Sequence, residues 1–506
     1  MQPPFHFSRR AVAANLALAV VLGVVAGGGC RPPRLLDPIK PLPFAGVTVR
    51  LACGDAGYAK ELVGRGKIWG TRTGGTVVLE PDWTTADAAV LPPARLGEMA
   101  VADVLAARPA ALADREHPLK WAEVLPAFQD KLCNWGRRPF AVPVAGDGFV
   151  LIYRVDRFTD PKAADAYRAK YQRELAPPPT WEDLRTVADL FATLDGKPSL
   201  PPLPADPTAA AVAFNQVAAC YDRAAVSSAA ATTPIGATPQ PEEPVSEGTA
   251  FRFHVDPDTA APRLTAPSFV AAFGWFHDTA KYRPATGDPR DALVNGSAVA
   301  AVLSLAEVAK LPKGPDGTVD RRFGIAPLPG SAVWYGADGK PRQASGGRNY
   351  VPYLGAGGQL GVVFKRTAVG EAAWDFLADL SGPAGADDTL GEVTLGAGPF
   401  RYSHVAISET AAKWQRYGFD AARTEQLSRA VGAFADVQLR EPVYPLRTPD
   451  HAEREAILAA AVRKAAAGAL PADKAAAEAQ AAWLAVDAKL PPADRRREAR
   501  NAVGLE

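Results

Sequence analysis

Short apolar runs alternate with helical patterns in the first part of the chain. Val47–Ala52 alternates apolar and polar residues as a strand does, and it runs into a turn at residues 53–57. Thr76–Glu80 and Ala86–Leu91 are two further strand candidates, with helical stretches between the runs. This alternation predicts an α/β sheet with crossover connections.

A helix is predicted to begin after Thr180. The Thr180 side chain can cap the first turn, and Asp183 follows three residues later, as in a capping box. The apolar residues that follow share one helical face: Trp181, Leu184, Val187, Ala188 and Phe191. We therefore expect Trp181, and likewise Trp374 on a later apolar helix face, to be core residues.

The remaining pattern predicts loops, one hairpin and a helical end. Residues 196–208 and 229–248 are rich in Pro, Ala, Ser and Thr and predict surface loops, and we expect the second to be dispensable for folding. Phe251–Leu264 predicts a hairpin that turns at residues 256–258. Near the C-terminus we expect helices from Thr448–Asp450 to Gly468 and over 472–489.

The N-terminus has the pattern of a secretory leader. Arg9 and Arg10 precede the almost wholly apolar stretch Ala11–Ala26, which is shorter than the ~20 residues of a membrane span. Gly27–Gly29 and then Cys30 resemble a bacterial lipobox, which implies that Cys30 becomes the lipidated first residue. The alternative is an ordinary cleaved signal with an incidental cysteine. We predict a signal peptide over 1–29 and a Pro-rich tether over 30–45.

Composition and charge narrow the class of protein. The chain has 506 residues, which predicts about two to four domains. Its 48% hydrophobic and 22% charged residues are typical of a folded globular protein, and a net charge of +1 gives no reason to expect a nucleic-acid partner. We expect a monomer. Cys53, Cys133 and Cys220 would remain after processing, and the sequence leaves open whether any of them form a disulfide.

No motif for catalysis, cofactor or metal is present in the sequence. It lacks a phosphate-binding loop, a dinucleotide fingerprint and a nucleophile elbow. The six histidines are widely separated, and the cysteines show no C-x-x-C spacing. We therefore expect no enzyme activity, no catalytic residue, no cofactor and no metal.

Several landmarks follow one another along the chain. They are the opening strand Val47–Ala52, then Ala86–Pro92, Arg138–Pro143, Val150–Phe158, Pro178–Leu184, Phe323–Gly330, Gly358–Val362 and Glu371–Leu377. In this order they resemble the family 1 extracellular solute-binding proteins, the group that includes maltose-binding and other sugar-binding receptors. The resemblance covers about residues 46–490. Two departures are Arg154, where Asn is usual, and the long biased segment 196–250.

The resemblance implies an α/β periplasmic-binding-protein-like fold of two discontinuous lobes joined by a hinge. Lobe one is expected to comprise 46–145 and 345–405, and lobe two 146–344 and 406–490, before a charged tail over 491–506. The implied function is an extracytoplasmic receptor of an ABC importer that closes on a small polar solute, a sugar or oligosaccharide. Its implied partners are permease subunits and, through the lipid, the membrane at its periplasmic or cell-surface side.

Candidate ligand-binding residues follow predicted strands or lie in Gly-rich stretches, because open α/β sheets bind ligands at strand ends. Aromatic rings can stack on sugar rings, and carboxylates, amides and guanidinium groups can bind hydroxyls. For each residue the alternative is a structural role in packing or in capping a turn. The candidates are Asp55, Trp83, Asp147, Trp334, Tyr335, Asn349, Tyr350 and Arg401.

Two other functions stay open at this point. One is an exported enzyme that acts on carbohydrate, and the other is an interaction lipoprotein that uses the cleft as a groove for a partner. A bound sugar without paired carboxylates beside its glycosidic bond would speak against the enzyme.

Overall fold

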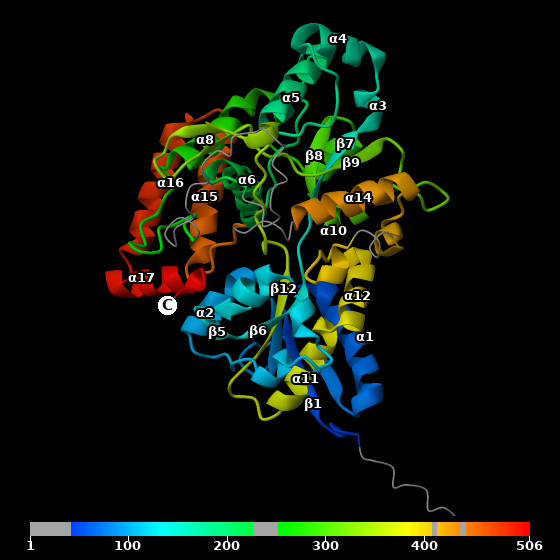
Figure 1. Cartoon of the computed structure of the whole chain (residues 1–506), viewed down its shortest axis with the longest axis vertical. Helices are drawn as coiled ribbons and strands as arrows, with labels where there is room; N and C mark the ends of the chain where they lie inside the picture. The colour runs from blue at the N-terminus through cyan, green and yellow to red at the C-terminus, as the bar shows by residue number, and fades with distance from the viewer. Residues whose placement is uncertain (1–41, 226–250, 407–411, 436–441, 506) are drawn as a thin grey trace, which may run out of the picture. The chain divides into compact units, whose positions relative to one another are not determined.

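A computed structural model describes residues 42–225, 251–406, 412–435 and 442–505 (Figure 1). The leader, Cys30 and the predicted loop 229–248 lie outside the described residues. Among the helices of the described residues, none combines the length and the apolar character that a bilayer span requires.

The first sheet confirms the strands predicted in the first part of the chain. Its order is β2-β1-β3-β12-β6, and β1 runs parallel to both β2 and β3, whereas β12 is antiparallel to β3 and β6. The register pairs Val49 with Val77 and Leu51 with Ala88. The strands are β1 (Thr48–Cys53), β2 (Thr76–Leu79), β3 (Ala88–Leu91), β6 (Ala141–Ala145) and β12 (Gln359–Val363).

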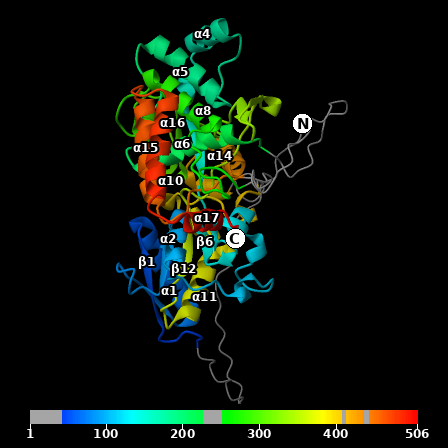
Figure 2. The same ribbon diagram turned by 90° about the vertical axis from the view of Figure 1, so that its left-hand side faces the viewer.

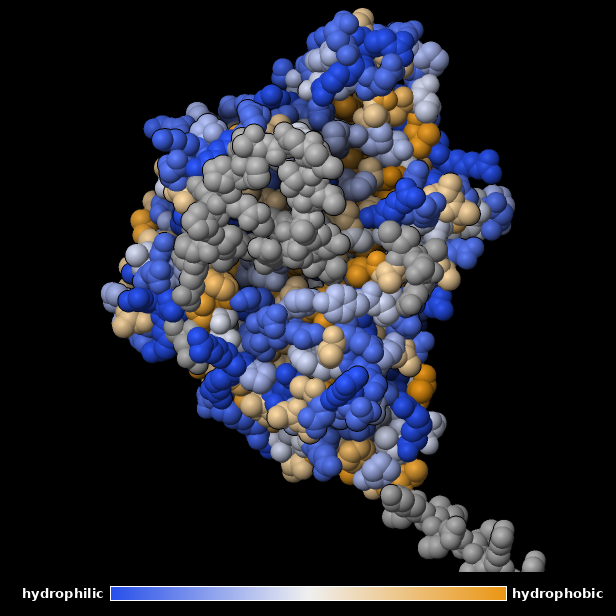
Figure 3. All heavy atoms as spheres, viewed as in Figure 1, coloured by the Kyte–Doolittle hydropathy of each residue, from blue (hydrophilic) through white to orange (hydrophobic). Residues whose placement is uncertain are grey.

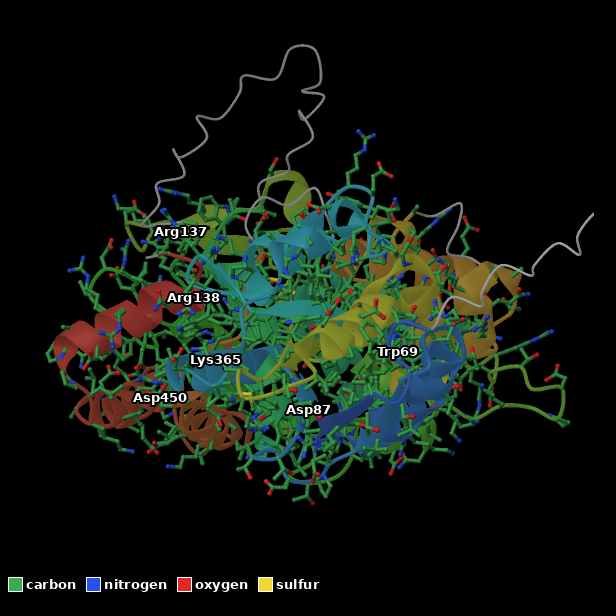
Figure 4. All side chains as sticks on the ribbon, turned by 90° about the horizontal axis from the view of Figure 1, so that it is seen from below. Trp69, Asp87, Arg137, Arg138, Lys365 and Asp450 are labelled. Atoms are coloured by element: carbon green, nitrogen blue, oxygen red, sulfur yellow. The ribbon has the colours of Figure 1, made fainter. Side chains whose placement is uncertain are left out.

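Helices α1 (Ala56–Thr73), α11 (Gly370–Ser381) and α12 (Pro383–Gly391) pack against this first sheet (Figure 1). Trp69 joins α1 to α11, because its ring centroid lies 5.6 Å from that of Phe376 and its Nε1 donates to Asp375 at 2.6 Å. Trp69 and Asp87 are both labelled in Figure 4, which views the molecule from below. Together the sheet and these helices form lobe one.

The second sheet has the order β8-β7-β9, with β7 (Phe149–Arg154) antiparallel to β8 (Ala300–Ser304) and to β9 (Phe323–Ala326). Helix α14 (Ala421–Phe434) packs against β7 and β9. Helix α5 (Trp181–Asp195) begins where the sequence predicts, with the Thr180 hydroxyl accepting the N–H of Asp183 at 3.1 Å. Trp181 and Trp374 are both buried, as predicted.

A helical layer completes lobe two. Its members are α6 (Pro207–Asp222), α8 (Pro267–Asp278), α15 (His451–Ala466) and α16 (Ala472–Asp487). Figure 2 shows α15 and α16 side by side. These two helices confirm the predicted pair near the C-terminus, and their inward faces share one apolar cluster with α6 and α8.

Smaller elements connect these layers. The predicted hairpin turn is present, since Val255 pairs with Pro262 and the Asp256 carboxylate accepts the N–H of Thr259 at 2.9 Å. The other strands are β4 (Asn134–Trp135), β5 (Arg138–Pro139), β10 (Val333–Tyr335) and β11 (Pro341–Gln343). The other helices of the α type are α2 (Leu96–Val101), α3 (Val155–Phe158), α4 (Pro161–Tyr171), α9 (Pro289–Val294), α10 (Leu305–Ala309) and α17 (Pro492–Ala502). A π-helical turn spans Ala127–Leu132, and short 3-10 turns lie at Pro93–Arg95, Ala110–Ala113, Trp121–Glu123, Ala280–Tyr282, Ser345–Gly347, Val393–Leu395, Tyr402–His404 and Gln415–Tyr417.

The chain passes from one lobe to the other at residues 146–148 and returns at 355–358. Tyr350 and Tyr353 pack in the apolar cluster of lobe two, whereas Leu360 belongs to that of lobe one. The chain therefore returns to lobe one at 355–358, later in the sequence than the expected boundary at 345. The reason is that Tyr350 and Tyr353 still pack in lobe two.

The segment predicted as a charged tail forms helix α17, which packs on lobe one. Ala502 belongs to the lobe-one core, and the Gly136 N–H donates to the Asn501 carbonyl at 2.8 Å. The buried Arg447 guanidinium donates from Nε to the Ala502 carbonyl at 3.0 Å and from Nη1 to the Asn134 carbonyl at 2.8 Å. The tail is thus an integral helix, although its charged residues dominate its sequence.

Candidate functional site

The two sheets present edges that meet at the crossing segments. The carboxyl ends of β1, β3 and β6 lie at the same edge of the first sheet as the start of β12. In the second sheet, Phe149 at the start of β7 pairs with Ser304 at the end of β8. Because Phe149 directly follows the crossing at 146–148, ligand-binding groups are expected beside these edges.

A pocket of about 540 Å³ lies at this edge of lobe two. It extends from Phe149 and Ala356, next to the crossing segments, to the loop before α6 and to the end of β8. Its volume falls within the usual range of small-molecule sites. Its lining includes aromatic, charged and amide side chains: Phe149, Trp181, Asp206, Gln216, Trp275, Arg283, Asp288, Arg290 and Glu307, together with Ala356.

Aromatic and proline side chains give the pocket firm walls. The rings of Trp181 and Trp275 meet edge to face with centroids 5.3 Å apart, and Trp275 Nε1 donates to the Trp181 carbonyl at 2.8 Å. Arg283 lies over the Trp275 ring at 5.0 Å and donates to the Pro201 carbonyl at 2.9 Å. Burial lowers the pKa of Arg283 to about 10, so it remains a cation at neutral pH.

Gln216 is the polar group best placed to receive a ligand. It is 4% exposed, and its amide Nε2 has no hydrogen-bond partner within the described part of the chain. A buried amide donor without a partner costs free energy, which a ligand oxygen could recover. The amide therefore marks one polar contact in a mainly apolar pocket.

The carboxylates around the pocket are held by the protein itself. Asp206 caps α6 by accepting the N–H of Ala209 at 2.8 Å, and Asp288 caps α9 by accepting the N–H of Asp291 at 2.9 Å. Glu307 pairs with Arg290 at 3.2 Å. These acids are thus used in local structure, although their outer oxygen atoms can still accept hydroxyl groups of a ligand.

Asp147 lies at the crossing itself and holds the returning chain. Its buried carboxylate accepts the backbone N–H groups of Gly355 at 3.0 Å, Ala356 at 2.9 Å and Gly357 at 3.4 Å. Burial raises the pKa of Asp147, and the three backbone donors oppose that shift. Asp147 thus ties the two crossing segments together.

The other predicted residues of lobe one separate into two groups. Asp55 caps α1 by accepting the N–H of Tyr58 at 2.9 Å, and Trp83 lies beside Gly54 with the Arg95 guanidinium 4.6 Å from its ring centroid. Both are at the edge that faces the crossing. Arg401 is instead wholly buried, and it donates to the Ser381 carbonyl at 2.8 Å as well as pairing with Glu123.

The predicted residues of lobe two lie on its helical side. The Asn349 amide ties the end of α6, donating to the Arg223 carbonyl at 2.8 Å and accepting the N–H of Ala225 at 2.7 Å. Tyr350 is buried beneath Arg348, whose guanidinium lies 4.9 Å from its ring centroid. Trp334 and Tyr335 lie on β10, and neither belongs to the lining of the pocket. These contacts are structural, and ligand contact by the predicted set remains a prediction.

Sequence reasoning missed the residues that form the pocket. Phe149 and Ser304 occupy strand ends, and that position was the available signal. Trp181 is correctly predicted to be buried, but the sequence does not show that its ring also lines a pocket. Cys53, Cys133 and Cys220 are free thiols, so no disulfide joins any two of them in the described part of the chain.

Comparison with known proteins gives a consistent result at the level of fold. No family model matches the sequence, and no curated protein matches it. Among solved structures, the cyclic alpha-maltosyl-1,6-maltose binding protein from Arthrobacter globiformis is similar, with a TM-score of 0.60 and 16% identity over 87% of this chain and 98% of that one.

Two further structures agree. The sugar-binding protein MalE from Xanthomonas citri has a TM-score of 0.60 and 16% identity, covering 88% of this chain and 98% of its own. An ABC transporter solute-binding protein from Agrobacterium radiobacter, in complex with ribitol, has a TM-score of 0.57 and 17% identity, covering 87% and 98%. The chain therefore has the two-lobed α/β fold of the maltose-binding-protein-like solute-binding proteins of ABC transporters.

Proposed function

We propose that this chain is an extracytoplasmic receptor of an ABC importer that binds a sugar or oligosaccharide in the pocket beside the crossing segments. The observation that carries the proposal is the position of that pocket. It lies at the sheet edge of lobe two, next to Phe149 and Ala356, which adjoin the segments that cross to lobe one.

Binding of the solute would drive closure of the lobes, because the closed form offers it contacts from both sides. The crossing at 146–148 lies close to the backbone of residues 398–399. A Cβ on Gly146 would be only 2.1 Å from the Pro399 carbonyl oxygen. Asp147 holds the return at 355–357 in the same place. A hinge of this kind absorbs rotation at few residues, and the solute favours the closed form only through its greater affinity for that form.

The chemistry of the pocket fits a ring with hydroxyl groups. Trp181, Trp275 and Phe149 offer apolar surface for the faces of a sugar ring. The amide of Gln216 and the outer oxygens of the capping carboxylates offer a small number of polar contacts. Each similar structure named above is a binding protein, and the proposal assigns no catalytic residue to this chain.

Export and lipid anchoring belong to the proposal and rest on the leader and on Cys30. A lipid on Cys30 would hold the receptor beside permease subunits, with the Pro-rich stretch 31–45 as a tether. These partners are inferred from the leader and the fold together.

A thermal-shift screen with monosaccharides, polyols and maltooligosaccharides tests the proposed solute. A solute at 100 times its Kd should stabilise the protein by ~2.7 kcal/mol.

Gln216→Leu should weaken binding of the best solute by roughly tenfold, because one hydrogen bond is lost. The control is Gln426→Leu, at an exposed position within α14 that does not line the pocket. If the screen yields products instead of stabilisation, the chain is an enzyme and the proposal is wrong.

A further inference from the structure

A second cavity lies where helix α17 meets both lobes. Its volume is about 250 Å³, and its wall combines Lys131, Arg223, residues 251–255, residues 442–446 and three residues of the α17 region. Ala502 in that wall belongs to the core of lobe one, and Phe253 belongs to the core of lobe two. The cavity shares no lining residue with the pocket proposed for the solute.

The wall of this junction cavity carries an excess of positive charge. Lys131, Arg223 and Arg252 line it, and no carboxylate does. Burial lowers the pKa of His254 to about 3, so the imidazole is neutral. The phenol of Tyr444 is neutral as well, because burial raises its pKa.

The nearest buried carboxylate is already shared. Asp222 accepts from Arg223 at 3.2 Å, from Arg263 at 3.0 Å and from the Ser268 hydroxyl at 2.9 Å. The single negative charge of Asp222 is therefore already shared by two guanidinium groups, and Arg252 would be a third. The buried Arg447, bound only to carbonyl oxygens by its described contacts, adds a further positive charge near Lys131.

Lys131 and Arg252 stand out because neither forms an ion pair with any residue in the described ranges. Lys131 Nζ is 3.5 Å from the Val503 carbonyl oxygen and 4.2 Å from the Phe251 ring centroid. Burial lowers the pKa of both cations, and this shift is opposed by Asp130 at Lys131 and by Asp222 and Asp256 at Arg252. Half-buried cations without an ion-pair partner are costly, so an anion placed between them would be strongly favoured.

We propose that the junction cavity binds a small organic anion carrying at least two negative charges, held by Lys131 and Arg252. Charge-assisted hydrogen bonds to both side chains would position the anionic groups. The rings of Phe251 and Tyr444 would cover its apolar part. The volume of about 250 Å³ is below the usual range for drug-sized ligands, which favours a compact acid or phosphate monoester.

Such an anion would also link the lobes. Lys131 precedes Leu132 of the lobe-one core, whereas Arg252 precedes Phe253 of the lobe-two core. An anion that contacts both favours the arrangement of lobes that keeps them close. By linkage, it would then change the affinity for a solute by the same factor as the solute changes the affinity for the anion.

The test uses the full chain with citrate, inorganic phosphate and phenyl phosphate as probes, and sodium chloride at equal ionic strength as the reference. We expect calorimetry to show saturable binding of citrate or phenyl phosphate. Lys131→Gln and Arg252→Gln should each weaken it by roughly tenfold or more, and Arg252→Lys, which keeps the charge, should weaken it less. The matched controls Lys474→Gln and Arg429→Gln, whose side chains are 70% and 66% exposed, should bind as the parent does.

Three results would overturn the proposal. The first is that none of the three probes binds beyond the effect of chloride. The second is that Lys131→Gln and Arg252→Gln, folded by circular dichroism, both retain the parent affinity. If either glutamine variant fails to fold, Lys131→Arg or Arg252→Lys replaces it. The third result is then a loss of binding in these charge-conserving variants that the two controls show equally.

Discussion

At the residue scale, buried polar side chains decide how lobe two responds to pH. Asn215 donates to the Tyr353 hydroxyl at 3.2 Å and contacts His254 Nε2 at 3.1 Å. Glu455 on α15 faces the same layer and accepts the Thr208 hydroxyl at 3.0 Å. Asp206, which lines the proposed solute pocket, is a charged neighbour that disfavours the ionised form of Glu455.

We predict that Glu455 makes the protein less stable as pH rises from about 4.5 to about 7. Burial raises the pKa of Glu455 from 4.5 to about 7, with Asp206 adding to the shift. Because the folded-state pKa lies above the unfolded value, the folded state binds the extra proton, so this contribution is fully present below pH 4.5 and is lost by about pH 7. The loss is on the order of 3 kcal/mol.

Urea denaturation of the parent and of Glu455→Gln at several pH values measures this effect. The glutamine should flatten the slope between pH 4.5 and 7 and stabilise the protein at pH 8, and Glu478→Gln, at an exposed site, should leave the slope unchanged. An unchanged slope in Glu455→Gln would assign the pH dependence to another group.

At the element scale, α17 has the most unexpected role. Its composition is that of a solvated charged segment, but its small residues Ala499 and Ala502 are buried and the Ala502 carbonyl binds Arg447. The face seen in Figure 3 is mainly hydrophilic, with hydrophobic side chains in small scattered groups. A charged helix can thus cover apolar surface while its long side chains stay in water.

We predict that truncation after Leu490 destabilises the protein by about 3 kcal/mol or more. The deletion uncovers the lobe-one surface beneath Ala502 and removes an acceptor from the buried Arg447, whose unsatisfied donor is costly. Thermal unfolding should show a clear drop in Tm, while Arg496→Gln, which removes an exposed charge within the same helix, should be neutral. A truncated protein with the parent Tm would show that α17 contributes nothing to stability.

At the scale of the whole molecule, two lobes joined by crossing segments predict closure on a solute. Radius of gyration from solution scattering should fall when a solute from the screen is added, and tryptophan fluorescence should change as Trp83 loses water. Trp83→Ala should weaken binding by about 1–2 kcal/mol, since the ring lies at the edge that faces the crossing.

Trp334→Ala is the informative comparison. The sequence places Trp334 in the cleft, whereas in the structure it lies on β10 with Arg342 5.0 Å from its ring centroid, and it does not line the pocket. We expect Trp334→Ala to keep nearly full affinity. Tight solute binding with unchanged scattering and full affinity in both variants would show that the solute binds elsewhere.

Anchoring of the whole protein is a separate prediction. When the full chain is expressed in a bacterium, mass spectrometry of the mature protein should find a diacylglyceryl group on an N-terminal Cys30. Cys30→Ser should release the protein into the soluble fraction. A mature N-terminus elsewhere in 20–45, without lipid, would favour the ordinary cleaved signal.

The sequence by itself determined the local structure and the fold class. The alternation over Val47–Ala52, the Thr180 cap and the apolar faces around Trp181 and Trp374 depend on residues close in the chain, and their periodicity is readable without a partner. The division into two α/β lobes was implied by the resemblance of the ordered landmarks to the family 1 solute-binding proteins, and the similar structures confirm it.

Only the tertiary structure decided which side chains meet. Arg401 and Asn349 have the chemistry of ligand contacts, yet their donors are used by carbonyl groups far away in the sequence. Phe149, Gln216 and Trp275 form one pocket because three distant segments fold against each other. A residue's type and neighbours in the chain determine its local conformation, but its partners across the fold determine whether its polar atoms remain available to a ligand.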